Sequence, residues 1–390
     1  MFNTNTFVSN VSFNVTPKSS SAFPLTVFDN HTFIINQLKS TSVIHNPVLI
    51  VNKVIVQETV INNDHNSTNG SKKKLAMLDI LHSNQDFETR AREFFKGCEV
   101  RFFMTWISSD PQRVFGEREM LAVDALFNSN PNGCLMILSN TMDSEHGFQV
   151  LKPVLDLGFK VQAIEPDFGF LFGDTPAKSW FDNIKEGNRD PGEIPLAQNL
   201  SNLLRLVVLY KYGGVYLDTD FILLKDFSGL CNAIGAQSAT RSGNWTRLNN
   251  AVLIFDKEHP LLYKFIEEFA LTFNGNKWGY NGPYLVSRVV ERWPNSNISV
   301  LPPAVFYQVD WTRIGGLFRR PENQAHRKWV EAKVVQLKEK SHGIHLWNKQ
   351  SRRLKIEDES IMARLVSDHC VVCTFFNRSR RLLESEFISS

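Results

Sequence analysis

Residues 199–221 read Asn199-Leu-Ser-Asn-Leu-Leu-Arg-Leu-Val-Val-Leu-Tyr-Lys-Tyr-Gly-Gly-Val-Tyr-Leu-Asp-Thr-Asp-Phe221. They predict a helix, a turn and a strand. The run 203–212 is apolar on nearly every side, which is typical of a buried helix, and Ser201 or Asn199 is a suitable cap for its start. Gly213 supplies the left-handed residue that ends the helix.

The strand after Gly213 is expected to continue to Phe221. Side chains alternate along a strand, so Tyr216, Asp218 and Asp220 should share one face. Two neighbouring carboxylates are unfavourable unless a cation lies between them, and Mg²⁺ or Mn²⁺ takes such oxygen ligands. The alternative is a solvated strand end that carries two Asp residues by chance.

Arg205 makes a metal–diphosphate site the stronger interpretation. It is a permanent cation on a buried helix just before the two aspartates, and a guanidinium can hold a diphosphate through paired hydrogen bonds. The alternative is a structural ion pair between Arg205 and Asp218 or Asp220.

The chain before this stretch alternates strands and helices. The expected elements are a strand over 100–107, a helix over 118–128, a strand over 133–138, a helix over 146–157 and a strand over 161–164. This order predicts a Rossmann-like α/β half with a mainly parallel sheet. Trp106, near the carboxyl end of the first strand, is placed either to stack on a nucleotide base or to pack in the core.

Three other segments complete the coarse organisation of the chain. Residues 167–194 are rich in breakers and predict a loop-rich insertion that could act as a lid. Pro260 starts a helix toward Phe273, with Glu267 and Glu268 on its exposed side. The turn-rich segment 278–283 offers the aromatic and amide groups that bind sugars, although Trp278 could equally be part of a packed loop.

Residues 1–75 are rich in Asn, Ser and Thr and predict a low-complexity stem or linker ahead of a single catalytic domain, 76–390. No transmembrane anchor or signal peptide is visible, and the lack of Arg disfavours a transit peptide. Asn-x-Ser/Thr sequons weakly favour a lumenal or secreted protein. Cys370 and Cys373 lack a second zinc-ligand pair, which favours a local or cross-domain disulfide over a zinc site.

Composition excludes several classes of function. The formal net charge of +3 is close to balance and supports neither a nucleic-acid partner nor an anionic membrane. No Gly-x-Gly-x-x-Gly or Walker loop occurs, which disfavours dinucleotide enzymes and P-loop nucleotide hydrolases.

Several motifs together resemble one known family. They are Phe102-Phe-Met-Thr-Trp-Ile-Ser, the stretch 199–220, Asn249-Asn-Ala-Val-Leu-Ile-Phe-Asp, Trp278-Gly-Tyr-Asn-Gly-Pro and His345-Leu-Trp-Asn-Lys. From about Phe94 to Cys373 the chain is similar to the α-1,4-glycosyltransferases, especially the plant members. The resemblance implies an Asp-x-Asp sugar-binding region at about 100–225 and an α-1,4-glycosyltransferase region at about 245–375.

The resemblance also implies a fold and a reaction. The fold would be GT-A-like, and a retaining, metal-dependent hexosyltransferase would move galactose or N-acetylglucosamine from a UDP-sugar to a glycan or glycolipid hydroxyl. No carboxylate stands out as a covalent nucleophile, so the implied attack is on the same face, assisted by the leaving phosphate. Relatives are Golgi membrane proteins, so a Golgi lumenal location is implied, with membrane association only if an anchor is missing from this chain.

The implied site residues fall into three groups. Asp218, Asp220 and Arg205 are expected to be catalytic, and Asp218, Asp220 and His345 to bind Mn²⁺ or Mg²⁺. The donor side comprises Trp106, Asn202, Tyr216, His345, Asn348 and Ser351, and the acceptor side comprises Trp278 and Asn281. Asn202 departs from the Asp of many relatives, which affects donor preference.

Two rival functions are a glycosidase and a non-catalytic carbohydrate-binding protein. A glycosidase would need Asp218 and Asp220 as acid and nucleophile. Residues two apart on one strand place carboxylates side by side rather than across a glycosidic bond, which disfavours it. The intact Asp218, Asp220, Arg205 and His345 disfavour the binding protein.

Overall fold

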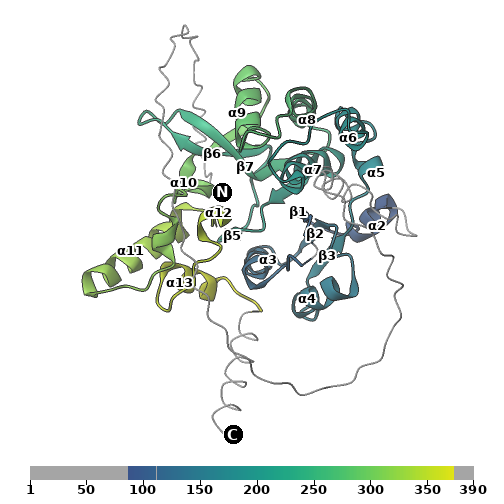
Figure 1. The fold of residues 1–390 in the computed structure, drawn as a ribbon. Coiled ribbons are helices and arrows are strands. Elements are labelled where there is room, and N and C mark those ends of the chain that lie inside the picture. The colour runs from purple at the N-terminus through teal and green to yellow at the C-terminus, as the bar shows by residue number, and fades with distance from the viewer. Residues whose placement is uncertain (1–86, 111, 373–390) are drawn as a thin grey trace, which may run out of the picture. The chain divides into compact units, whose positions relative to one another are not determined.

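A computed structural model describes residues 87–110 and 112–372, and Figure 1 shows their arrangement. The central sheet has seven strands in the order β3-β2-β1-β4-β7-β6-β8. These strands are β1 (Val100–Trp106), β2 (Gly133–Ser139), β3 (Lys160–Ile164), β4 (Gly214–Leu217), β6 (Ala233–Ala239), β7 (Trp245–Phe255) and β8 (Ser299–Leu301). The predicted stem over 1–75 lies outside the described residues.

The pairing of the strands confirms the predicted α/β fold with a mainly parallel sheet. The pairs β1–β2, β2–β3, β1–β4 and β6–β8 are parallel, whereas β4–β7 and β6–β7 are antiparallel. Helices α3 (Glu117–Ser129) and α4 (Glu145–Leu155) connect the first three strands. The carboxyl ends of β1 and β4 therefore meet at one edge, where Asp218 follows β4.

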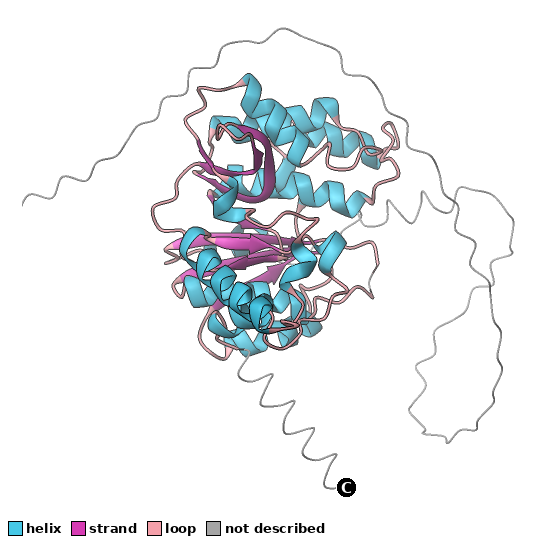
Figure 2. Ribbon diagram, turned by 90° about the vertical axis from the view of Figure 1, so that its left-hand side faces the viewer, coloured by secondary structure: helices cyan, strands magenta, loops and turns pink. Residues whose placement is uncertain are grey.

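Helices lie on both faces of the sheet (Figure 2). Phe102 and Met104 of β1 pack in the apolar cluster beneath α3 and α4, whereas Phe103 joins the cluster on the opposite face with α7 (Leu196–Tyr212). Neighbouring residues of a strand point to opposite faces, so a strand covered on both sides must be apolar throughout. This explains the continuous apolar run of β1.

Helix α7 begins earlier than the sequence predicts. It starts at Leu196 behind Pro195, so Asn199 and Ser201 lie inside it rather than at its cap. The side-chain oxygen of the buried Asn199 accepts a hydrogen bond from Asn281, while its Nδ2 is buried without a partner among the described residues. The predicted left-handed residue is confirmed, since Gly213 has φ +64°.

The predicted continuous strand 214–221 is wrong. Strand β4 ends at Leu217, and the chain enters a separate two-stranded sheet as β5 (Phe221–Leu223), antiparallel to β9 (Gly343–His345). The Phe221 amide bonds the Asp218 carbonyl at 3.0 Å, which closes a turn over residues 218–220. The alternation of side chains in the sequence does not reveal this break, because β5 pairs with β9, which is distant from it in sequence.

The predicted loop-rich insertion over 167–194 is wrong for its first part, which is helical and packed, whereas residues 186–194 form turns and loop. Helix α5 (Phe168–Phe172) packs against α7, and α6 (Ala177–Lys185) packs against α8. Trp180 is 1% exposed and packs edge-on against Phe269 and Phe273 of the next helical layer. Burial of these aromatic side chains outweighs the breakers around them. The possible role of the segment as a lid stays a prediction.

The expected exposure of Glu268 is also wrong, because it is buried between two arginines of the next helix.

The remaining helices lie in the first and last parts of the chain. They are α2 (Phe87–Phe94), α8 (Pro260–Thr272), α9 (Pro283–Arg292), α10 (Pro303–Phe306), the 3₁₀ turn η2 (Ile314–Leu317), α11 (Gln324–Lys340), α12 (Asn348–Ser351) and α13 (Ile361–Asp368).

A disulfide joins Cys98, just before β1, to Cys134 on β2. Cys370 is also disulfide-bonded, which confirms that this segment takes part in a disulfide; Cys373 lies outside the described residues. Cys231 is an exposed free thiol. Within 87–110 and 112–372, every helix is too short or too polar to cross a bilayer.

Candidate active site

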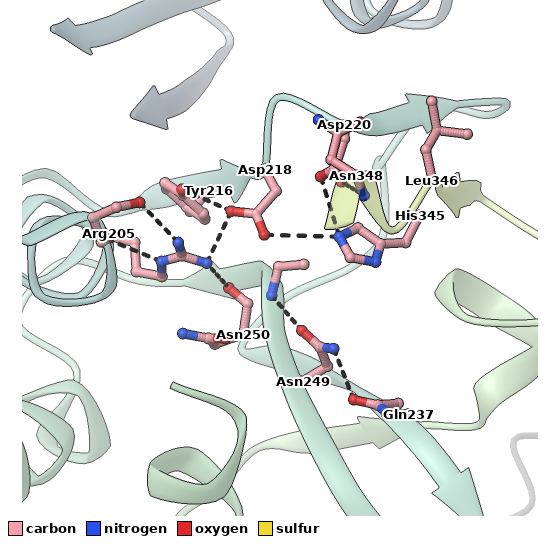
Figure 3. Close-up of polar contacts among 12 residues, drawn as sticks. Arg205, Tyr216, Asp218, Asp220, Gln237, Asn249, Asn250, His345, Leu346 and Asn348 are labelled. Atoms are coloured by element: carbon pink, nitrogen blue, oxygen red, sulfur yellow. Dashed lines mark hydrogen bonds and ion pairs between the residues drawn. The ribbon is translucent and has the colours of Figure 1, made fainter. Parts of the chain in front are cut away.

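Asp218, Asp220 and His345 converge where β4 ends and the small β5–β9 sheet begins (Figure 3). The turn over 218–220 directs both carboxylates to one side, and the pairing of Phe221 with His345 places the imidazole opposite them. One ligand atom from each side chain lies within 4.8 Å of the others. The predicted trio is therefore assembled in space.

His345 is the charge partner of both carboxylates. Its Nε2 lies 3.2 Å from Asp220 Oδ1 and 3.8 Å from Asp218 Oδ2. Burial alone would lower the pKa of His345, but the Asp220 and Asp218 carboxylates raise it to about 9. Burial alone would raise the pKa of Asp220, but the His345 imidazolium and the Asn348 amide lower it below its ordinary value.

The segment after His345 holds Asp220 in place. The Asn348 amide donates to Asp220 Oδ2 at 2.7 Å, and the Leu346 amide donates to the Asp220 carbonyl at 2.8 Å. Between them Trp347 adopts φ +54°, a left-handed conformation that non-glycine residues seldom take. Ser351 closes the segment by donating to the Leu346 carbonyl at 2.6 Å. The segment thus brings the predicted His345 and Asn348 to the carboxylates, whereas the predicted Ser351 stabilises the segment itself.

Arg205 forms the structural ion pair that the sequence left open. Its Nη1 lies 2.9 Å from Asp218 Oδ1 and donates to the Asn250 carbonyl at 2.8 Å. Its Nε and Nη2 donate to the carbonyl and hydroxyl of Ser201. The side chain is 2% exposed, so these contacts anchor Asp218 from beneath.

The sequence did not predict the series of hydrogen-bonded hydroxyl groups that ends at Asp218. Tyr216 donates to Asp218 Oδ1 at 2.9 Å, and its hydroxyl lies 2.8 Å from Thr105, which in turn lies 2.6 Å from Ser201. Burial raises the pKa of Tyr216 well above its ordinary value, so it remains a donor. Thr105 and Ser201 carry no signal except that they interrupt apolar runs.

The other predicted donor-side residues lie around this core. Asn202 is buried and accepts from Asn250 Nδ2 at 3.0 Å, so it faces the same region as Arg205. Trp106 is 6% exposed and packs edge-on against Phe115, while Arg113 covers its ring. Trp106 therefore belongs to a packed cluster in the described structure, at the carboxyl end of β1.

The two predicted acceptor-side residues differ in environment. Trp278 is 57% exposed, and the Lys349 ammonium lies 4.1 Å from the centre of its ring, which brings this turn beside α12. Asn281 is 3% exposed and donates to Asn199 and to the Asn274 carbonyl. Asn281 thus holds the turn onto α7, whereas Trp278 presents an aromatic face to solvent.

The donor set suits a divalent cation. Asp218 and Asp220 offer hard carboxylate oxygens, and His345 offers a borderline nitrogen that binds metal when neutral. Their separation is that of ligands around a single ion. The orphaned Nδ1 of His345, which has no hydrogen-bond partner among the described residues, leaves its tautomer free for such a role.

Comparison with known proteins places this site in a family. Residues 116–240 match the "glycosyltransferase sugar-binding region containing DXD motif", and residues 254–376 match the "alpha 1,4-glycosyltransferase conserved region". Lactosylceramide 4-alpha-galactosyltransferase of Pongo pygmaeus is 30% identical over 226 residues, which cover 54% of this chain and 94% of that protein. The chain belongs to the α-1,4-glycosyltransferase family.

Other members of the family are also similar. A protein of Arabidopsis thaliana is 30% identical over 71% of this chain and 42% of its own length. Human alpha-1,4-N-acetylglucosaminyltransferase is 26% identical over 52% of this chain and 58% of its own length. Apart from the Pongo protein, the chain spans about half the length of the curated relatives it matches.

The solved glycosyltransferase GlyE of Streptococcus pneumoniae is 12% identical, with a TM-score of 0.41 over 72% of this chain and 64% of that one.

Proposed function

We propose that this α-1,4-glycosyltransferase is a metal-dependent, retaining hexosyltransferase that uses a UDP-sugar. The observation that carries the proposal is the convergence of Asp218, Asp220 and His345 beside Arg205, at the sheet edge where α/β enzymes bind ligands. Galactose and N-acetylglucosamine are the proposed sugars, since the relatives' names include transferases of both. The proposed acceptor is a hydroxyl of a glycan or glycolipid.

Asp218, Asp220 and His345 would hold Mn²⁺ or Mg²⁺. A bound ion would supply Lewis-acid stabilisation of the leaving diphosphate. Arg205 orients the Asp218 carboxylate through their ion pair, and the Asn348 backbone amide orients the Asp220 carboxylate. His345 would bind the ion through a ring nitrogen after releasing a proton.

In the proposed reaction the bond between the anomeric carbon and the diphosphate oxygen breaks. The acceptor hydroxyl oxygen bonds to the same face of that carbon, and its proton passes to the departing diphosphate. Asn202 and Asn250, which contact each other, would orient donor-sugar hydroxyls, and the exposed Trp278 would stack on the C–H face of the acceptor. Trp106, Tyr216 and Ser351 support the donor site by packing and hydrogen bonding.

Screening UDP-sugars for UDP release tests the proposal. With MnCl₂ present, UDP-galactose or UDP-N-acetylglucosamine should be consumed, and a chelator should stop the reaction. Sugar release from glycosides without nucleotide, insensitive to chelator, would instead identify a glycosidase. Stoichiometric UDP-sugar binding with no turnover against any acceptor would identify a binding protein.

We also propose that the enzyme works in the Golgi lumen. The Cys98–Cys134 disulfide supports an oxidising compartment, because such bonds are rare in reducing ones. The test is to follow the location of C-terminally tagged versions of the protein that carry longer N-terminal segments. If every version stays in the cytosol, the proposed location is wrong.

A further inference from the structure

Arg118 is a second arginine near Asp220, half-buried, and neither the sequence motifs nor the family match assigns it a role. It lies in the first turn of α3, which packs against β5 directly after Asp220. Its Nη2 donates to the Leu354 carbonyl at 2.6 Å, and its guanidinium carbon lies 4.8 Å from the centre of the Phe318 ring. These contacts fix the guanidinium between α3 and the segment that follows α12.

One of the other two nitrogens of this guanidinium is unusual. Nη1 of Arg118 is buried, and it has no hydrogen-bond partner among the described residues. Leaving a charged donor buried and unpaired is costly, so such groups in native structures call for an acceptor. Burial lowers the pKa of Arg118, while the charges of Glu119 and Asp220 raise it, so Asp220 acts on this group electrostatically.

Arg205 makes the contrast clear. Each of its nitrogens already donates to Ser201, Asn250 or Asp218, so it has little capacity left for a ligand. Arg118, which is close enough to Asp220 to be affected by its charge, has a donor nitrogen without a partner among the described residues. An anion bound beside Asp218 and Asp220 would find Arg118, rather than Arg205, ready to donate to it.

We propose that Arg118 donates through Nη1 to a phosphoryl oxygen of the donor's diphosphate and so is a substrate-binding residue of the transferase. This inference rests on the proposed function, because it requires a nucleotide diphosphate in the site. It assigns Arg118 the direct phosphate contact and leaves Arg205 as the residue that positions Asp218. Neutralising a phosphoryl oxygen also stabilises the leaving group as its charge develops.

A purely structural role is the competing explanation. Arg118 would then only tie Leu354 to α3. Arg189 offers a matched control, since it also donates to backbone carbonyls, those of Ala270, Leu271 and Phe273, and lies over an aromatic ring. Arg189 makes these contacts between α6 and α8. Both helices lie on the opposite face of the sheet from α3 (Figure 1).

Calorimetric binding of UDP and of uridine in MnCl₂ separates the two explanations. Arg118→Gln should weaken UDP about 10- to 100-fold, the effect of losing a charged hydrogen bond, and leave uridine affinity unchanged. Arg118→Lys keeps the charge and should recover part of the loss, whereas Arg189→Gln should bind UDP like wild type. Melting temperatures of all variants report structural damage separately.

Equal UDP affinity in wild type and Arg118→Gln would overturn the proposal while leaving the transferase function intact. If Arg118→Gln weakens the binding of UDP and of uridine equally, and Arg118→Lys does not restore it, the proposal is also wrong. Arg118 then has only the structural role of joining Leu354 to α3. If wild type binds UDP-sugar but neither transfers nor hydrolyses it, the proposed function fails, and the ratio of UDP to uridine affinity still tests the phosphate contact.

Discussion

Asp220 is held by two different partners, the His345 imidazole and the Asn348 backbone amide. The motif Asp-x-Asp predicts that two carboxylates meet, and the family resemblance adds His345. Neither reveals that backbone amides of the segment 345–351 orient the second carboxylate. Thr105 and Ser201 were unpredictable because their role depends on three elements meeting at Tyr216. At the residue scale, sequence therefore identifies the charged groups better than the groups that position them.

Asp220→Asn tests the central charge. The amide oxygen can still accept from Asn348, but the metal loses an anionic ligand, so turnover should fall about 100-fold or more. Removing the Asp220 charge loses the ion pair with His345 but also relieves the crowding of like charges with Asp218, so without metal the variant should melt near wild type.

The measurement is melting with and without Mn²⁺ plus UDP, alongside UDP release. Wild type should be stabilised by the ligands and the Asp220→Asn variant should not. Asp226→Asn, which removes an exposed carboxylate just beyond β5, is the control and should match wild type. A normal ligand-induced shift in Asp220→Asn would place the site elsewhere.

Gly282→Ala tests the amide pair near Arg205. A Cβ at Gly282 would lie 2.9 Å from Asn202 Oδ1 and 3.2 Å from Asn250 Nδ2, so these side-chain ends must move. We expect the KM for the donor sugar to rise about fivefold, the effect of one neutral hydrogen bond, with little change in kcat. Steady-state kinetics would show this, and Gly316→Ala, which meets nothing within 4 Å, should leave KM unchanged.

At the element scale, strands and helices with strong periodicity were predictable, and their ends were not. The β1–α3–β2–α4–β3 order follows from patterns that each element carries by itself. The break between β4 and β5, the packed α5 and α6, and the early start of α7 depend on partners far away in sequence. Glu268 is the clearest case, because its exposure on α8 was decided by Arg288 and Arg292 on α9.

The Glu268 cluster predicts a pH-dependent link between α8 and α9. Burial alone would raise the pKa of Glu268, but hydrogen bonds from Arg288 and Arg292 lower it below its ordinary value. A depressed pKa adds stability above the unfolded-state pKa, about 4.3, and loses it as pH falls through the folded-state value. Glu268→Gln should therefore cost about 1–3 kcal/mol at pH 7 and progressively less below pH 5.

Urea unfolding of both proteins between pH 4 and pH 8 measures this difference. Glu267→Gln is the matched control, since Glu267 pairs only with Lys264 across one turn of an exposed face. That variant should lose about 0.5 kcal/mol or less at any pH. A Glu268→Gln penalty that stays constant down to pH 4 would show that packing, and not the charge, links α8 to α9.

At the scale of the whole molecule, the fold shows which Asn-x-Ser/Thr sequons are exposed enough to carry a glycan, which the sequence alone does not show. Asn199 is 2% exposed inside α7 and accepts a hydrogen bond from Asn281. Asn244 is exposed in the turn between β6 and β7, and Asn297 is exposed just before β8. A glycan needs an exposed loop, so composition and motif alone could not separate these sites.

If the full chain is directed into the secretory pathway, its folded fraction should carry glycans at Asn244 and Asn297 and none at Asn199. A glycan on Asn199 would displace Asn281 and open the packing of α7, so any chain modified there should fail to fold. Glycopeptide mass spectrometry of the monomeric, protease-resistant fraction measures occupancy directly. Asn244→Gln and Asn297→Gln should each remove one glycan with no loss of stability, whereas Asn199→Gln should remove none and lower the melting temperature. Occupied Asn199 in the folded fraction would contradict the placement of this helix in the core.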